Sequence, residues 1–282
     1  MIEILRTVDQ LRRWSRAQRC SGSGSIGLVP TMGALHAGHA SLIRAARAAC
    51  SHVAVTLFVN PTQFGPNEDL NRYPRTFDAD CALAESEGGD VLFAPTVEEI
   101  YPSGAATFVE VEGLSDRLDG RSRPGHFRGV ATVVAKLFIA AEADRAFFGQ
   151  KDAAQVSVLR RMTRDLRIGT EIVVCPIVRD ADGLALSSRN AYLSSDERQQ
   201  ALTLSRALGR VEALVARGQR HAAALVAAAR EEFAAHPAVR VDYMAAVDWE
   251  TLDAVEIARP GTLFAVAAYV GSTRLIDNTI LL

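Results

Sequence analysis

The chain has 282 residues, of which 49% are hydrophobic and 23% are charged, with a formal net charge of -2. This length predicts about two domains. The near-neutral charge argues against a protein that binds nucleic acid through bulk positive charge. Aromatic residues make up 6% of the chain, which argues against a base-stacking surface. We therefore expect no nucleic-acid partner.

The cysteine spacing and the hydropathy indicate in which cell compartment the protein works. The four cysteines are far apart and none forms a C-x-x-C pair, so we expect free thiols, with no zinc site and no disulfides. The N-terminus lacks an apolar run after a basic start, so no signal peptide is predicted. No uncharged apolar run reaches the ~18 residues of a membrane span. We expect a cytoplasmic protein with no membrane partner.

Short apolar runs alternate with amphipathic stretches through the first two thirds of the chain. The predicted strands are Ile26–Val29, Val53–Val59, Val91–Phe93, Arg145–Phe148 and Glu171–Cys175. The predicted helices are Gly38–Cys50, Thr76–Glu87, Gly129–Ala141 and Asp152–Leu166. Strands that alternate with helices predict an α/β fold with a Rossmann-like, doubly wound parallel sheet.

The pattern changes after Pro176, so we place the domain boundary between Cys175 and Pro176. Domain 1–175 would bind the nucleotide, and 176–282 would form a smaller α+β domain. A hairpin is predicted over Ile177–Leu186, around Asp182-Gly183. The remaining predicted segments are the helices Ser195–Ala216 and Ala222–Ala235 and the alternating stretches Arg240–Val247, Thr262–Val270 and Arg274–Ile280.

Two common phosphate-binding loops are excluded. Gly22–Gly27 matches G-x-G-x-x-G, but it precedes a predicted strand where a dinucleotide-binding loop must follow one. We interpret it as a linker. A P-loop needs Gly-Lys, and neither Lys136 nor Lys151 follows a glycine. The chain has only these two lysines but 29 arginines. A lysine in a chain that otherwise uses arginine suggests a specific role.

The strongest signal is the stretch Met32–His39, MGALHAGH, between a predicted strand and an amphipathic helix. Ligands of doubly wound sheets bind at this edge, and the N-terminus of a helix favours phosphate. Gly33 and Gly38 allow a nucleotide to approach the backbone. His36 and His39 are three residues apart, so they share a helix face and can donate hydrogen bonds to phosphate. The alternative is that one histidine caps the helix while the other packs.

This H-x-G-H element resembles the signature of the nucleotidyltransferase superfamily, which includes the class I aminoacyl-tRNA synthetases. The superfamily carries a second signature, a basic loop that contains serine. Leu186–Asn190, LSSRN, resembles that loop, with Arg189 where the synthetases place a lysine. Alone this short stretch is weak evidence for the superfamily, but it follows the first motif in the expected order.

Three further stretches resemble the pantothenate synthetase family. Phe58–Gly65, with the following Glu68-Asp69 and Tyr73–Arg75, resembles its pantoate loop, and Phe148–Gln155 resembles its ATP- and pantoate-binding element. Gly120–Gly129 resembles its flexible active-site segment. The resemblance runs from about residue 26 to residue 190 and continues more weakly to the C-terminus. Leu186 stands where methionine is usual, and Ala79 occupies a position that is often acidic.

The resemblance implies an ATP-dependent ligase that condenses pantoate with β-alanine through a pantoyl-adenylate, releasing AMP and pyrophosphate. The implied catalytic residues are His36, His39, Lys151, Ser188 and Arg189, with His39 as the candidate proton donor. The implied ATP-binding residues are Met32, Gly33, Ala34, Leu35, His36, Ala37, Gly38, His39, Gly149, Gln150, Lys151, Asp152, Val178, Leu186, Ser187, Ser188 and Arg189. Pantoate or β-alanine contacts are implied for Asn60, Gln63, Arg123, His126 and Gln155.

The family also implies Mg²⁺ as a cofactor, with Asp80 as the candidate protein ligand, and a homodimer. We expect Arg121, Arg123 and Arg128, in their Gly- and Pro-containing loop, to fold over the phosphates. Two alternatives remain: a nucleotidyltransferase that stops at an adenylylated product, and a non-catalytic small-molecule- or RNA-binding relative of the synthetases. The retained histidines and Lys151 favour a catalyst, and the near-neutral charge disfavours tRNA.

Overall fold

The computed structural model describes residues 2–20, 24–66 and 68–282. Within these ranges the chain forms a six-stranded parallel sheet and a separate three-stranded antiparallel sheet. The strands of the large sheet are β1 (Glu3–Leu5), β2 (Ile26–Thr31), β3 (His52–Leu57), β4 (Val91–Phe93), β5 (Arg145–Gly149) and β6 (Glu171–Cys175). The predicted Rossmann-like α/β class is confirmed.

The strand order of the large sheet is β1-β4-β3-β2-β5-β6. From the central strand β2 the chain first builds outward on one side, through β3 and β4. It then crosses back and adds β5 and β6 on the other side of β2. The carboxyl ends of β2 and β5 therefore form the switch point of the sheet, where such folds bind their ligands.

Helices cover both faces of this sheet. They are α1 (Val8–Cys20), α2 (Ala37–Ala49), α3 (Phe77–Ser86), α4 (Val97–Ile100), α5 (Asp119–Ser122), α6 (His126–Ala141) and α7 (Ala153–Asp165). Side chains of a strand alternate between the faces. Leu28 and Ala54 pack with α6 and α7, while Val29 and Val55 pack with α2. Burial on both faces explains why these strands are almost wholly apolar.

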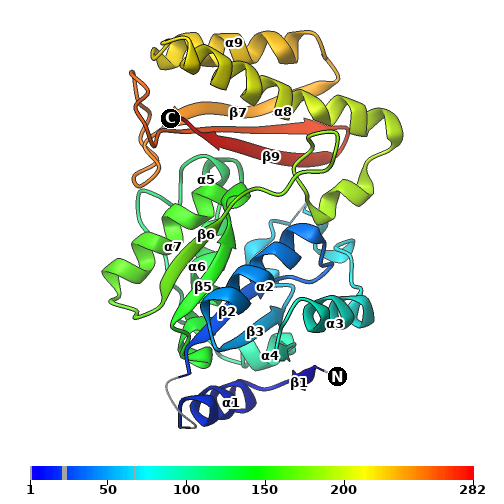
Figure 1. Cartoon of the computed structure of the whole chain (residues 1–282), viewed down its shortest axis with the longest axis vertical. Coiled ribbons are helices and arrows are strands. Elements are labelled where there is room, and N and C mark those ends of the chain that lie inside the picture. The colour runs from blue at the N-terminus through cyan, green and yellow to red at the C-terminus, as the bar shows by residue number, and fades with distance from the viewer. Residues whose placement is uncertain (1, 21–23, 67) are drawn as a thin grey trace.

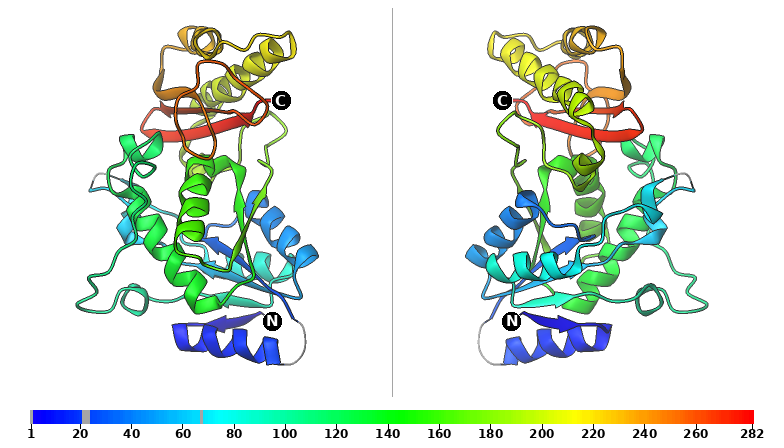
Figure 2. Two further views of the ribbon diagram at one scale, coloured as in Figure 1. Left: turned by 90° about the vertical axis from the view of Figure 1, so that its left-hand side faces the viewer. Right: turned by 90° about the vertical axis from the view of Figure 1, so that its right-hand side faces the viewer.

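The C-terminal unit is an antiparallel sheet with two helices on one face. Its elements are α8 (Ser195–Ala216), α9 (Ala222–Ala234), β7 (Val239–Val247), β8 (Leu263–Val270) and β9 (Thr273–Ile280). Phe264 and Val266 pack with the two helices, whereas Leu263 and Ala265 belong to the core of the N-terminal unit. The small sheet thus lies between α8 and α9 on one side and the large domain on the other (Figures 1 and 2).

Several local predictions need revision. The expected hairpin at 177–186 is present but short, with an antiparallel bridge between Arg179 and Ala185 and backbone hydrogen bonds on either side of it. Helix α6 begins at His126, three residues before the predicted start, with Gly125 at the N-cap position in a left-handed conformation (φ of 81°). The helix α1 and the strand β1 were not predicted. Residues 22 and 23 of the expected linker Gly22–Gly27 lie outside the described residues.

Two further points concern the chain as a whole. Strand β6 ends at Cys175, and the chain then leaves the large sheet, so we keep the proposed domain boundary at this position. The described part of the chain contains no helix with both the length and the hydrophobicity that crossing a bilayer requires.

Candidate active site

A cavity of about 230 Å³ opens at the switch point of the sheet. The predicted site residues that line it are Met32, His36, Gly38, His39, Asn60, Gln63, Arg123, His126, Gly149, Lys151, Asp152, Gln155, Val178, Leu186, Ser187, Ser188 and Arg189. Six other predicted residues do not line it: Gly33, Ala34, Leu35, Ala37, Asp80 and Gln150. The structure therefore brings together segments that are up to 157 positions apart, as between Met32 and Arg189.

His36 and His39 form the first turn of α2 and contact one another. His36 is the N-cap, and its Nδ1 accepts a hydrogen bond of 3.1 Å from the backbone N–H of Gly38. The Nδ1 of His39 accepts a bond of 3.3 Å from the backbone N–H of His36. A neutral imidazole that accepts at Nδ1 carries its proton on Nε2. Each ring therefore has an Nε2–H donor to offer, and the two alternatives, helix cap and phosphate ligand, are compatible.

Both imidazoles are neutral at physiological pH. Burial, together with the charge of Lys151, lowers the pKa of His36 to about 4. Burial and the neighbouring His36 lower the pKa of His39 to about 3. A group with such a pKa holds almost no dissociable proton at neutral pH. We therefore revise the expected role of His39 in the free protein from proton donor to hydrogen-bond donor.

Side chains of Asp80 and Ser188 hold the loop before α2 in place through hydrogen bonds to its backbone. Gly33 and Ala34 both adopt left-handed φ angles, 85° and 51°. The carboxylate of Asp80 accepts backbone hydrogen bonds from Ala34 (2.9 Å) and Leu35 (2.7 Å), and the hydroxyl of Ser188 donates to the carbonyl of Ala34 at 3.0 Å. Because both oxygens of Asp80 are engaged by the loop, the geometry favours this support over the metal-ligand role that we expected.

Lys151 follows β5 in the short 3-10 turn η3 (Gln150–Asp152). Its side chain lines the cavity, is 20% exposed, and lies 3.9 Å from a carboxylate oxygen of Asp152. The position agrees with the predicted one, at a strand-to-helix junction. The side chain lines the same cavity as the two histidines, so an anionic ligand near them would meet the positive charge of Lys151 and two neutral donors.

Arg189 also lines the cavity, but an acidic partner already holds it. Its Nε and Nη2 donate to both carboxylate oxygens of Asp69, at 2.9 and 2.8 Å. Burial disfavours the charged carboxylate, yet the hydrogen bonds and charge of Arg189 outweigh it and lower the pKa of Asp69. The sequence predicted the arginine and did not predict its partner.

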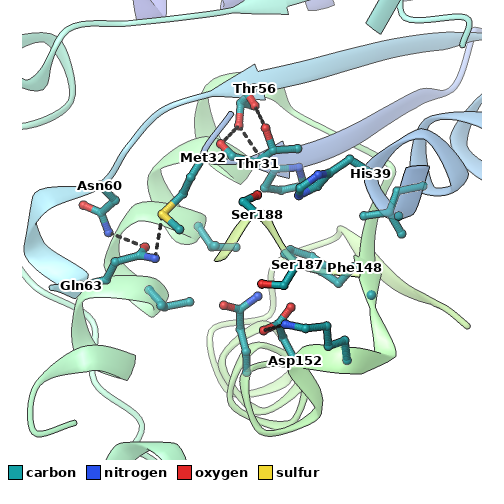
Figure 3. Close-up of a pocket in the computed structure, with 18 of the residues that line it drawn as sticks. Thr31, Met32, His39, Thr56, Asn60, Gln63, Phe148, Asp152, Ser187 and Ser188 are labelled. Atoms are coloured by element: carbon teal, nitrogen blue, oxygen red, sulfur yellow. Dashed lines mark hydrogen bonds and ion pairs between the residues drawn. The ribbon is translucent and has the colours of Figure 1, made fainter. Parts of the chain in front are cut away.

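On the opposite side of the cavity the orientation of Gln63 is fixed by Asn60. Asn60 Nδ2 donates to the backbone carbonyl of Gly129 at 3.1 Å, and its Oδ1 accepts from the backbone N–H of Thr62 at 3.3 Å. Nδ2 also donates to Gln63 Oε1 at 3.0 Å, so Gln63 presents its Nε2 donors toward Met32 and the cavity (Figure 3). Asn60 is 1% exposed and acts through Gln63.

The expected arginine loop is only partly aimed at the cavity. Arg123 lines it and donates to both oxygens of Glu68, at 2.7 and 2.6 Å. Arg121 is exposed, and Arg128 lies over the ring of Phe108 at 3.8 Å, so neither lines the cavity. Helix α6 already includes Arg128, which turns it outward. The expectation that all three arginines fold over phosphates is not met here.

His126 lines the cavity with both ring nitrogens engaged. Its Nδ1 lies 2.8 Å from the carbonyl of Gln63, which can only accept, and its Nε2 lies 2.9 Å from a guanidinium nitrogen of Arg123. Burial and the charge of Arg123 lower the pKa of His126 to about 4. The arrangement favours a role in holding the Gln63 loop over the direct substrate contact that we expected.

Sequence reasoning missed an apolar wall of the cavity. Val130, Val133, Val134 and Leu137 line it from one face of α6. Their i, i+3, i+4, i+7 spacing was visible, but it indicates any buried helix face equally well. The further lining residues that were missed are Pro30, Thr31, Leu42, Thr56, Phe58, Tyr73, Phe148, Pro176 and Ile177.

The side chains of the cavity offer little to a metal ion on their own. Over the described ranges, no three His, Cys, Asp or Glu side chains gather closely enough to hold one. Mg²⁺ that binds with a nucleotide commonly takes most of its ligands from phosphate and water. The donor set is compatible with an ion that arrives with a triphosphate.

Comparison with known proteins gives a consistent result. A model of the pantoate-beta-alanine ligase family matches residues 3–280. A pantothenate synthetase of Acidobacterium capsulatum is 65% identical over 260 residues, which cover 92% of this chain and 87% of that protein.

Two solved structures are also similar. A pantothenate synthetase of Thermus thermophilus has a TM-score of 0.93 and 46% identity, with 99% of each chain covered. A pantoate-beta-alanine ligase of Francisella tularensis, complexed with beta-gamma ATP and β-alanine, has a TM-score of 0.79 and 32% identity, covering 99% of this chain and 98% of that one. The family match, the relative and these structures agree over nearly the whole chain. The chain therefore belongs to the pantoate–β-alanine ligase family.

Proposed function

We propose that this chain condenses pantoate with β-alanine to give pantothenate, using ATP and releasing AMP and pyrophosphate. One observation carries the proposal. A cluster that suits phosphate, formed by His36, His39, Lys151 and Ser188, shares a single cavity with carboxamides and an apolar helix face. Such a cavity can hold a triphosphate against a small hydroxy acid with an apolar centre.

The apolar wall suits pantoate. Pantoate carries two methyl groups on its central carbon, with hydroxyl groups and a carboxylate around them. The valines of α6 would pack against the methyl groups, while Gln63 and Gln155 would bond the polar groups. Because Asn60 makes Gln63 present Nε2, the substrate atom at Gln63 must be a hydrogen-bond acceptor, as a hydroxyl or carboxylate oxygen is.

The first step joins the acid to the nucleotide. A carboxylate oxygen of pantoate forms a bond to the α-phosphorus of ATP. The bond between this phosphorus and the oxygen that bridges the α- and β-phosphates breaks, so that pyrophosphate leaves. Little covalent work falls to the protein, which aligns the reactants and stabilises charge on the phosphate oxygens. The Nε2–H groups of His36 and His39 and the ammonium of Lys151 are the donors for that charge. Asp152 would contact the ribose.

The second step uses the same cavity. The free amine of β-alanine attacks the acyl carbon of the pantoyl-adenylate, the bond to AMP breaks, and the amine loses a proton. Hydrolysis of the adenylate would waste ATP, so the cavity must keep water away from the acyl carbon. Its apolar α6 face and its position between the two domains serve that purpose.

Three finer points belong to this proposal. Mg²⁺ would bind with ATP through the phosphates, where it would neutralise part of their charge. We propose a cytoplasmic enzyme and a homodimer, both in keeping with the family resemblance. Light scattering at micromolar concentration tests the dimer, and a monomer alone would contradict it.

The test of the function is an assay of products. The protein is incubated with ATP, Mg²⁺ and pantoate, with and without β-alanine. We expect AMP, pyrophosphate and pantothenate in equal amounts when both acids are present. Formation of ADP and inorganic phosphate would overturn attack at the α-phosphorus. Steady release of pyrophosphate without β-alanine would instead support an enzyme that stops at an adenylylated product.

A further inference from the structure

Strand β9 of the C-terminal domain reaches the turn that carries Lys151. Asn278, on this strand, is 3% exposed. Its Nδ2 donates to the backbone carbonyls of Gln150 (3.0 Å) and Lys151 (2.9 Å), and its Oδ1 accepts from the side-chain Nε2 of Gln150 at 3.2 Å. The orientation of the amide is unambiguous, because the two backbone carbonyls can only accept.

The two carbonyls belong to the two peptide groups on either side of the Lys151 Cα. A peptide group is planar, so fixing both planes fixes the backbone dihedral angles between them. The turn η3 is only three residues long. Short 3-10 turns have poor internal hydrogen-bond geometry. The external bonds from Asn278 therefore restrain the backbone from which the Lys151 side chain leaves.

The neighbouring residue on β9 holds a second segment of the cavity. Asp277 is 3% exposed, and its carboxylate accepts from both terminal nitrogens of Arg179, at 2.6 and 2.9 Å. Arg179 follows Val178, which lines the cavity. Two consecutive residues of one strand thus contact two separate segments of the cavity lining.

We infer that Asn278 is a positioning residue that aims the ammonium of Lys151 at the phosphates of ATP. The inference rests on the proposed function and deepens it, because it makes the C-terminal sheet part of the catalytic arrangement. Asn278 itself need not touch a substrate. Its effect on the reaction passes through Lys151.

The alternative is that Asn278 serves only the contact between the two domains. Two variants distinguish these roles. Asn278→Asp keeps the shape of the side chain but turns a carboxylate oxygen toward two carbonyl oxygens, which repel it. Asn278→Ala removes the bonds and leaves a small gap. A positioning role predicts that Asn278→Asp slows adenylation more than Asn278→Ala does. A role confined to the domain contact predicts instead that each variant loses rate only in proportion to its loss of melting temperature.

The experiment measures single-turnover formation of the adenylate and the KM for pantoate. We expect at least a tenfold lower rate for Asn278→Asp, a smaller loss for Asn278→Ala, and a KM for pantoate within twofold of wild type for both. Val270→Ala, which removes buried contacts from the same domain away from the cavity, is the matched control. It should lower the melting temperature while leaving the rate within twofold of wild type.

A double-mutant cycle shows whether the effect passes through Lys151. In a Lys151→Ala background, adding Asn278→Ala should change the rate by less than twofold. Equal losses in both backgrounds would overturn the inference, as would a wild-type rate in Asn278→Asp.

Hydrogen exchange separates a failure of this inference from a failure of the proposed function. We expect faster exchange of the amides of residues 150–153 in Asn278→Ala than in Val270→Ala, whatever the reaction catalysed. Unchanged exchange there would also overturn the inference.

Discussion

The guanidinium of Arg189, which lines the cavity, forms a bidentate ion pair with the carboxylate of Asp69, with hydrogen bonds of 2.9 and 2.8 Å. The two residues are 120 positions apart and come from the second signature loop and the pantoate loop. The arginine is partly buried, so its charge is offset at short range before any nucleotide binds. A phosphate that uses Arg189 must therefore share the guanidinium with Asp69.

This pair leads to a prediction about ATP affinity. Asp69→Asn keeps a hydrogen-bond acceptor near Arg189 but removes the competing negative charge. We expect a KM for ATP several-fold below that of wild type, whereas Arg189→Ala should lower kcat/KM for ATP by at least ~10²-fold. Steady-state kinetics with ATP varied gives both values. A raised KM for ATP in Asp69→Asn would show that the carboxylate does not compete with phosphate.

The histidine pair leads to the second prediction. His39→Ala removes an oriented Nε2–H donor and should lower the single-turnover rate of adenylation by at least ~10²-fold. His221→Ala, a change at an exposed histidine, is the control and should leave the rate unchanged. If His39→Ala retains a rate within threefold of wild type, His39 has no part in the chemistry.

Lysine geometry leads to the third prediction. Lys151→Arg should be nearly as damaging as Lys151→Ala, with both losing at least ~10²-fold in kcat/KM, or about 2.7 kcal/mol of transition-state stabilisation. A guanidinium is a wide planar fork, while an ammonium is a compact charge. The backbone here has little freedom to shift, because Asn278 bonds both flanking carbonyls. Thermal melts check folding, and an arginine variant with more than a third of wild-type activity would contradict the geometric argument.

Buried neutral histidines lead to the fourth prediction, on stability against pH. The pKa values of His36, His39 and His126 fall from 6.5 to about 4, about 3 and about 4 in the folded protein. Below pH 6.5 the unfolded chain therefore binds more protons than the folded one, and the free energy of unfolding falls as the pH falls. We expect urea midpoints to decrease from pH 6.5 to pH 5, a window in which most carboxylates stay ionised.

A single variant checks the source of that slope. His126→Asn removes one titrating group, so its urea midpoint should depend less steeply on pH between 6.5 and 5 than that of wild type. The comparison uses the slope and not the absolute stability, because the substitution also breaks contacts with Arg123 and Gln63. An identical slope would mean that His126 is not the neutral, buried group described here.

The sequence predicted those parts of the site that depend on local patterns. Met32–His39 was placed correctly between a strand and a helix, because a strand, a glycine turn and an amphipathic helix each leave a signal within a few residues. Lys151 stood out because lysine is rare in this chain. The pairing of Met32–His39 with Ser188 and Arg189 followed from the order of two known signatures.

The parts that were missed depend on contacts between distant segments. Asp69 and Asn278 act on residues 120 and about 128 positions away. The sequence placed Asp69 with the pantoate loop but gave no sign of its partner, and nothing near Asn278 marks it as functional. Asp80 became the candidate metal ligand through the family resemblance, because Ala79 replaces an often acidic residue beside it, whereas the fold supplies two backbone N–H groups as partners of its carboxylate. The apolar face of α6 had the right periodicity, but periodicity does not distinguish a protein core from a substrate wall.

The contact between β9 and the Lys151 turn also bears on how the protein is made. Translation delivers His36, Lys151 and Ser188 long before it reaches Asn278, so a nascent chain that stops short of β9 holds the signature residues without the bonds that aim Lys151. Such a fragment would carry the binding groups and lack the alignment that catalysis needs. We therefore expect such a fragment to form the adenylate more slowly than the full chain does, because the turn that carries Lys151 lacks its contact with β9.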